Sequence, residues 1–320
     1  MHQLSGTIAG ISLGALLLGG CYTTDLDPGL GSVFACTQVE ANCPSGLSCV
    51  NGVCESSEGV PRVLVTNPED EQRFVTATPD IPIGPPPDPL TIEIRIQGEL
   101  DLVEFDPDQA HVFGEGHVVV TVDGAQQAII DTGSIDNPTA VTIDIDNQAG
   151  PHRITAQAVR NDGVPYDNPE STGTRLIWIE SEAVEGLRPF VAIKSPWPGT
   201  TFPLDDAEIT VELTTLNFEM IPPDQGSIEG KGHAHIYYDK AFPDCLGDMD
   251  CDADYIAVVG APPSSTFQLP DSGARSVDLA AVLREVGHDQ YRFPYACDPM
   301  IDLEVCKPIF DTVTLERADQ

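Results

Sequence analysis

The sequence predicts an all-β protein whose body consists of two copies of one domain. Short runs rich in Val, Ile and Thr alternate polar and apolar residues, for example TIEIRIQ at 91–97 and HAHIYY at 233–238. A period of two is the pattern of strands with one buried face, and turn residues separate the runs. Two blocks of sequence also recur in the same order, as expected for tandem homologous domains.

The repeat is visible in two pairs of segments. Residues 63–74 (VLVTNPEDEQRF) match 191–202 (VAIKSPWPGTTF): a short strand, a turn containing proline, and a phenylalanine. Residues 107–124 (PDQAHVFGEGHVVVTVDG) match 223–240 (PDQGSIEGKGHAHIYYDK), with Pro-Asp-Gln, Gly-x-Gly-His and a later Asp in common. The distance along the chain between matching segments differs for the two pairs, because the first copy carries an insertion, IPIGPPPDP at 81–89. The prolines of this insertion exclude a regular strand.

Each copy has the strand content of an immunoglobulin-like sandwich. About seven short strands in roughly 120 residues fit that fold, with a jelly-roll variant as the second interpretation. We therefore expect two tandem immunoglobulin-like β-sandwiches, over residues 62–182 and 187–320. One segment, 278–286, has the apolar spacing of a short helical turn. His152 and His288 each lie close after a glycine, where we expect a corner hydrogen bond.

The N-terminus resembles a bacterial lipoprotein signal. An uncharged apolar run over about 8–18 ends in the letters LGGC, similar to the lipobox, in which the cysteine receives a diacylglycerol and becomes the new N-terminus. The run is too short to span a bilayer. We expect a signal peptide over 1–20, lipidation of Cys21, and an anchor and spacer over 21–35. The alternative is an ordinary cleaved signal peptide that ends near a cysteine.

The predicted location follows from this resemblance. Tyr22 stands after the lipidated cysteine, which by analogy with Gram-negative lipoproteins favours the outer membrane or cell surface over retention at the inner membrane. The anchor at Cys21 would supply the membrane contact, because no other segment is apolar enough to enter lipid.

Cysteine usage supports export. Apart from Cys21 there are eight cysteines, and an even number in an exported chain is typical of disulfides. The first four span 19 residues as C-x6-C-x5-C-x4-C, so a module over 36–54 would depend on two bridges, and a linker over 55–61 follows. It resembles the small CPxGxxCxxGxC modules of surface lipoproteins; zinc is the competing interpretation, but C-x2-C pairs are absent. The eight predicted disulfide cysteines are Cys36, Cys43, Cys49, Cys54, Cys245, Cys251, Cys297 and Cys306.

Composition restricts the partners and the chemistry. The formal net charge is −36 over 320 residues, which disfavours nucleic acid and anionic lipid, because both require basic patches. The sequence contains no G-x-S-x-G, H-E-x-x-H, Walker or Rossmann motif, so we expect a non-catalytic protein without a cofactor. The leading hypothesis is an interaction or structural module whose loops, at 85–89 and 245–254, contact a protein or glycan. A hydrolase built on carboxylates is a third, minor hypothesis.

The alternative hypothesis is an envelope protein that binds Zn or Cu. His233 and His235 would share one face of a strand, where Asp239 would line up with them and His288 would arrive from a neighbouring strand. The alternate residues of this strand would take the opposite, core-facing side: Ala234, Ile236 and Tyr238. The first copy keeps His117 but has valine at the second histidine position, which favours a structural role for the shared histidine.

The string G-H-x-H-x-x-x-D also resembles short exported bacterial β-sandwich domains, a resemblance that implies a fold and an export address but no activity. In the second copy it covers Gly232, His233, His235 and Asp239, whereas in the first only Gly116, His117 and Asp123 match.

Four carboxylates at alternate positions form a second candidate site. They resemble the opening of an EF-hand loop. However, Ala253 stands at the position of the glycine that allows the turn in such loops, and Val259 at the position of the glutamate that completes the coordination of calcium. We expect an exposed acidic tip, with weak calcium binding as the alternative. The four residues are Asp248, Asp250, Asp252 and Asp254.

Overall fold

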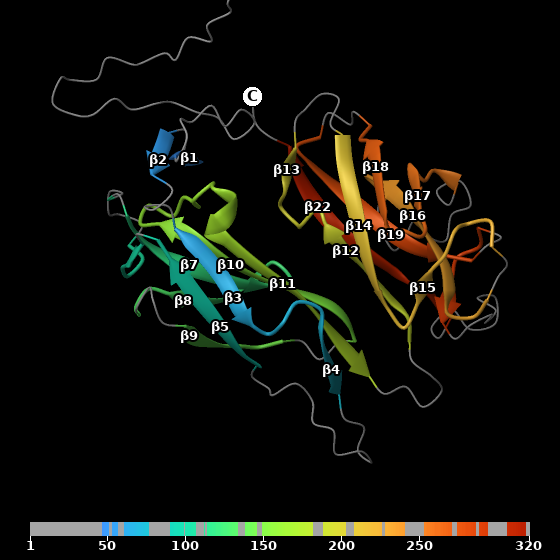
Figure 1. Cartoon of the computed structure of the whole chain (residues 1–320), viewed down its shortest axis with the longest axis horizontal. Coiled ribbons are helices and arrows are strands. Elements are labelled where there is room, and N and C mark those ends of the chain that lie inside the picture. The colour runs from blue at the N-terminus through green and yellow to red at the C-terminus, as the bar shows by residue number, and fades with distance from the viewer. Residues whose placement is uncertain are drawn as a thin grey trace, which may run out of the picture.

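In a computed structural model, the elements of the described residues are β-strands apart from one short 3-10 turn (Figure 1). The structure describes residues 47–50, 53–56, 61–76, 90–98, 100–106, 112, 114–133, 138–145, 149–181, 188–202, 208–225, 228–240, 253–270, 274–285, 288–293 and 306–317. The predicted signal peptide, Cys21 and the proline-rich insertion lie outside these residues.

The first copy consists of two sheets that face each other. The smaller sheet has the order β3 (Arg62–Asn67), β5 (Leu90–Gln97), β9 (Thr139–Ile143). The larger sheet has the order β4 (Gln72–Thr76), β11 (Thr172–Ser181), β10 (Gly150–Arg160), β7 (Glu115–Val122), β6 (Asp101–Leu102), with β8 (Ala125–Ile130) also paired to β7. A short 3-10 turn, η1 (Pro169–Ser171), precedes β11.

The second copy repeats this arrangement strand for strand. Its smaller sheet is β12 (Phe190–Ser195), β14 (Glu208–Leu216), β18 (Ser264–Gln268). Its larger sheet is β13 (Thr201–Phe202), β22 (Phe310–Arg317), β19 (Ser276–Arg284), β16 (Lys231–Tyr238), β15 (Glu219–Met220), with β17 (Ala257–Val259) paired to β16. A further ribbon joins β20 (Arg292–Phe293) to β21 (Lys307–Pro308). The predicted all-β class with two tandem sandwiches is confirmed.

The alternating pattern explains how each sandwich forms its core. In β5, Ile92, Ile94 and Ile96 are buried and the residues between them are turned outward. Each sheet therefore presents an apolar face, and the two faces of one copy pack against each other as in other sandwiches. Two separate cores result, one for each copy.

The predicted helical turn over 278–286 is wrong, because β19 continues to Arg284 as a strand. Both faces of this strand are buried: Leu279 and Ala281 pack in the core, while Ala280 and Val282 form a small cluster on the opposite face. A strand that is apolar on both sides loses the polar alternation and shows an apolar run instead.

The cysteine-rich segment contributes one hairpin to the described residues. β1 (Leu47–Val50) pairs with β2 (Val53–Ser56), and Cys49 lies opposite Cys54 in the register. Far along the chain, Cys306 is buried and disulfide-bonded. The pairing of the remaining cysteines stays a prediction.

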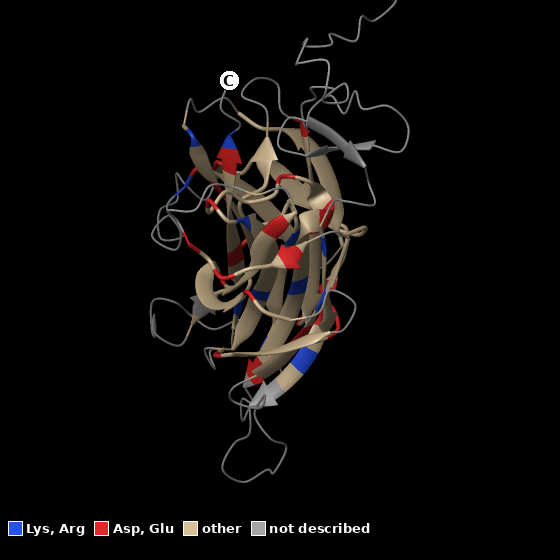
Figure 2. Cartoon of the chain, turned by 90° about the vertical axis from the view of Figure 1, so that its left-hand side faces the viewer, with Lys and Arg blue, Asp and Glu red and all other residues tan. Residues whose placement is uncertain are grey.

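Charged residues of both signs occur along the described part of the chain. Acidic and basic positions are interspersed over the strands and turns (Figure 2). Within the described part of the chain, no helix has the length and hydrophobicity needed to cross a bilayer.

Candidate functional site

Two histidines lie side by side on β16, a strand that is hydrogen-bonded on both sides. β16 pairs with β19 over most of its length and with β17 near its centre. Ala234, Ile236 and Tyr238 pack in the core, as predicted. His233 and His235 therefore share the opposite face, where they are 0% and 1% exposed. The strand fixes the direction of both imidazoles.

The third histidine, His288, lies in the turn that follows β19, whereas the sequence predicts its arrival from a neighbouring strand. Its backbone is left-handed, with φ of 64°. Its N–H donates to the carbonyl of Glu285 at 3.0 Å, and its own carbonyl accepts a hydrogen bond from Nη1 of Arg284 at 3.2 Å. Its side chain meets His235 on β16, so its imidazole contacts the strand and not the corner.

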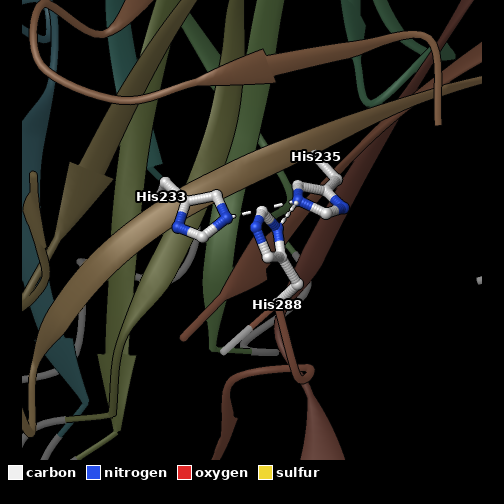
Figure 3. Close-up of side chains that lie close together, drawn as sticks. All are labelled: His233, His235 and His288. Atoms are coloured by element: carbon white, nitrogen blue, oxygen red, sulfur yellow. Dashed lines mark hydrogen bonds between the residues drawn. The ribbon is translucent and has the colours of Figure 1, made fainter. Parts of the chain in front are cut away.

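The three imidazoles converge on one place (Figure 3). Nε2 of His233 lies 3.2 Å from Nε2 of His235, and that same atom lies 3.0 Å from Nδ1 of His288. One ligand atom of each residue lies within 4.8 Å of the others. Because two of the histidines are buried and the third is exposed, the cluster lies at the border between the sandwich and solvent. Three such nitrogen donors suffice to hold one metal ion.

Burial keeps the imidazole of His233 neutral. Removal from water, followed by the charges of His288 and Arg284, lowers the pKa of His233 to about 4. Its Nδ1 is buried and has no hydrogen-bond partner in the described part of the chain. At neutral pH this side chain therefore presents a free lone pair, the form of histidine that binds metals.

Residues that sequence reasoning did not single out surround the cluster. The ring of Tyr255 lies 3.9 Å from that of His235, measured between centroids. Arg284 is fully buried and donates both to the hydroxyl of Tyr237 and to the carbonyl of His288. Tyr237 follows His235 at the spacing of one strand face, but no spacing in the sequence indicates the contacts of Tyr255 and Arg284, which come from other segments of the chain.

The other predicted ligands do not join the histidines. Asp239 is exposed, left-handed with φ of 53°, and its N–H donates to the carbonyl of Asp278 at 2.7 Å. Of the four calcium candidates, Asp254 lies within the described residues, where its carboxylate pairs with Nζ of Lys240 at 3.0 Å. The remaining three, Asp248, Asp250 and Asp252, lie outside the described residues.

The first sandwich has an equivalent place with one histidine. The strand pairings align His117 with His233, because each lies opposite the same position of the next strand. Two residues on, Val119 is equivalent to His235.

A glycine and an aromatic ring complete this place in the first sandwich. Gly163 is equivalent to His288: both are left-handed, with φ of 80° and 64°, and both N–H groups donate to the carbonyl three residues earlier. The ring of Phe105 lies 4.9 Å from that of His117. An atom of the same ring lies 3.6 Å from the position a Cβ would take on Gly163. Phe105 thus packs where the second sandwich has imidazoles.

The predicted corner hydrogen bond of His152 is confirmed. Nδ1 of His152 lies 2.7 Å from the carboxylate of Asp123, which also accepts the N–H of Arg153 at 2.7 Å. In the second sandwich the equivalent positions are Val277 and Asp239. This bond therefore belongs to the first copy and serves its corner.

The two sandwiches contact each other through a buried ion pair. The side chains of Arg153 and Asp311 pair while each is 9% exposed. The guanidinium also donates to the carbonyl of Ile193 at 3.0 Å, and the carboxylate accepts the N–H of Ile193 at 2.7 Å. One residue of the first sandwich thus closes a network with two strands of the second.

Apolar and polar contacts extend this junction. Nε1 of Trp197 donates to Oγ1 of Thr155 at 3.0 Å, and Nζ of Lys194 lies 2.6 Å from a carboxylate oxygen of Glu71. A separate apolar cluster also spans both copies; it contains Leu176, Trp178, Phe190, Ala192 and Leu216.

These observations define an all-β protein with tandem immunoglobulin-like sandwiches. No protein-family profile matches the sequence. No curated protein matches it either.

Several solved structures are similar to this chain, with low TM-scores and low sequence identity. Fibronectin(III)-like modules of CbhA from Clostridium thermocellum are 10% identical, with 80% of this chain and 93% of that chain covered and a TM-score of 0.22. A protein of Corynebacterium diphtheriae named as membrane anchored is 12% identical. The match covers 87% of this chain and 68% of that chain, with a TM-score of 0.24. A chimeric titin Z1Z2 tandem is 10% identical. The match covers 81% of this chain and 97% of that chain, with a TM-score of 0.21.

Proposed function

We propose that this protein is a non-catalytic, lipid-anchored protein of the cell envelope that acts as an interaction or structural module. The observation that carries the proposal is the junction between the sandwiches, where Arg153, Asp311 and Ile193 form a buried network. The guanidinium and the carboxylate also bond to the carbonyl and the N–H of Ile193, so several directional contacts fix how the two sandwiches meet. The junction therefore favours one fixed arrangement of the two copies over free rotation about a linker.

The remaining parts of the proposal come from the sequence. Cys21 would carry the lipid, residues 21–35 would form the anchor and spacer, and the cysteine-rich module over 36–54 would lie between this spacer and the sandwiches. The loops at 85–89 and 245–254 would contact a protein or a glycan, because loops on a rigid scaffold tolerate variation and commonly carry binding residues. An immunoglobulin-like fold is compatible with such a role but does not by itself specify a partner.

A distance measurement across the junction tests the fixed arrangement. Spin labels at the exposed positions Gln126 and Thr266, one in each sandwich, should give a single narrow distance distribution by pulsed electron resonance. The Asp311→Ala variant should broaden it. A broad distribution in the wild-type protein would contradict the proposal.

A fractionation experiment tests the anchor. The Cys21→Ser variant should move from the membrane fraction to the soluble fraction, because the lipid would supply the membrane affinity. The His152→Val variant, altered far along the sequence, is the matched control and should stay with the membranes. Equal membrane association of the Cys21→Ser and control proteins would refute lipid anchoring at this residue.

A further inference from the structure

The histidine cluster of the second sandwich is not a requirement of the fold. The first sandwich places Val119 and Gly163 at the positions of His235 and His288, and it keeps the same strand order. A ring of Phe105 fills the space there. The second copy instead brings polar nitrogens together in a largely buried place, which is unfavourable unless each nitrogen has a partner.

Hydrogen bonding among the imidazoles does not satisfy the cluster. A neutral imidazole nitrogen carries either one proton or one lone pair. Nε2 of His235 faces nitrogens of both His233 and His288, at 3.2 and 3.0 Å. A single proton or a single lone pair on this atom would therefore have to serve two contacts at once. A cation between the rings would instead accept one lone pair from each histidine.

The spacing of the nitrogens matches that of ligands around one metal ion. Metal–nitrogen bonds of about 2.0–2.1 Å in tetrahedral geometry place neighbouring nitrogens about 3.3 Å apart. The two measured separations, 3.2 and 3.0 Å, lie close to this value. The ligand atoms of all three histidines lie within 4.8 Å of one another.

The surrounding contacts hold the three ligands before any ion binds. His233 and His235 are fixed by β16, which is paired on both sides. The turn of His288 is held by its own N–H bond and by the buried side chain of Arg284. Contacts beyond the ligands are a common means of orienting metal-binding histidines.

We propose that His233, His235 and His288 form a binding site for one divalent transition-metal ion, Zn²⁺ or Cu²⁺, through Nε2, Nε2 and Nδ1. Imidazole donors favour these ions, whereas Ca²⁺ and Mg²⁺ require oxygen ligands. Asp239 is not a ligand of this site. The site is independent of the partner-binding role proposed above.

Metal analysis of the full-length exported protein, made without a histidine tag, tests the site. After equilibration with Zn²⁺ or Cu²⁺ and removal of free ion, elemental analysis should find about one ion per chain, and Ca²⁺ should not be retained. Titration calorimetry should show at least a 100-fold weaker affinity for the His288→Gly variant. The electron resonance spectrum of the Cu²⁺ form should show three coupled nitrogens in the wild type and two in that variant.

Two further variants keep the test decisive. His288→Gly installs the residue that the first sandwich has in the same left-handed turn, so the fold should tolerate it. His235→Val likewise installs the residue of the first copy, and circular dichroism checks that it folds. His117→Val is the matched control and should leave one ion bound. The site would be overturned if the wild type retained no ion, or if the His288→Gly and His235→Val proteins retained as much ion as the wild type.

Discussion

The two sandwiches share a strand order but differ on one face of the equivalent strands β7 and β16. The first has His117 beside Val119 and Gly163, with Phe105 packed over them. The second has three histidines whose nitrogens lie 3.0 and 3.2 Å apart.

The difference separates what the fold needs from what one copy has added. A histidine at the position of His117 and His233 is common to both copies and is buried in both, so it is compatible with a purely structural role. The other two histidines occur in one copy alone. Their positions are a strand residue turned away from the core and a left-handed turn residue, both of which exchange without altering the strand order.

The largest expected effect lies at the junction, where the copies also differ. Asp311 is equivalent to Gly173 of the first copy, where a Cβ would lie 2.7 Å from the carbonyl oxygen of Val63. Asp311→Ala removes the partner of the buried Arg153 and should destabilise the protein by about 3–5 kcal/mol, because an uncompensated charge stays buried. Urea unfolding at pH 7 measures this change.

A variant on the same strand serves as the control for the junction. Glu316 is exposed, so Glu316→Ala should change the stability by no more than about 0.5 kcal/mol. Equal midpoints for the Asp311 and Glu316 variants would mean that the ion pair contributes nothing to holding the sandwiches together.

A transplant of the cluster gives the next largest effect. The combined changes Phe105→Ala, Val119→His and Gly163→His would place three histidines on the first sandwich. The count of bound Zn²⁺ or Cu²⁺ should rise from one to two per chain. Binding should stabilise this sandwich by about 2.7 kcal/mol at an ion concentration 100-fold above Kd, set against about 1 kcal/mol of strain from a left-handed histidine.

The single change Val119→His is the control for the transplant, because it supplies two histidines without the third. It should leave the count at one. If the triple variant also binds one ion, three histidines at these positions are insufficient, and the turn around His288 must contribute more than its side chain.

The dependence of stability on pH gives a smaller effect. The pKa of His233 is lowered to about 4, against about 6.5 in the unfolded chain. As the pH falls, the unfolded state takes up the proton first, so the metal-free protein should lose about 2 kcal/mol between pH 6.5 and 4. Urea unfolding in the presence of a chelator measures the loss.

A variant without this imidazole provides the comparison. His233→Leu should show a shallower loss of stability over the same range of pH. Burial also lowers the pKa of His117, so some dependence should remain. An unchanged slope in the His233→Leu protein would mean that this imidazole does not set the response to acid.

Much of the fold was predictable because strands with one buried face carry their own signature. β5 and β22 alternate buried and outward-facing residues, and the internal repeat allowed the two copies to be aligned. The sequence of β19 lacks this alternation because both faces of the strand are buried. Its apolar run then had the spacing of a helical turn.

The candidate site was predictable in part for a similar reason. His233 and His235 lie on one strand, so their common face follows from sequence spacing alone. Asp239 fails to follow them because its backbone turns left-handed at the end of the strand. The pairing of Arg153 with Asp311 has no local signal, since 158 residues separate the two.

The smallest expected effect concerns the corner of the first sandwich. His152→Val installs the residue that the second sandwich carries as Val277, and it removes the bond to Asp123. The carboxylate of Asp123 is 44% exposed, so water can replace the imidazole as its partner. The loss should therefore be about 0.5–1 kcal/mol, as for a typical hydrogen bond. Urea unfolding measures it, and a loss above about 2 kcal/mol would show that the two corners are not interchangeable.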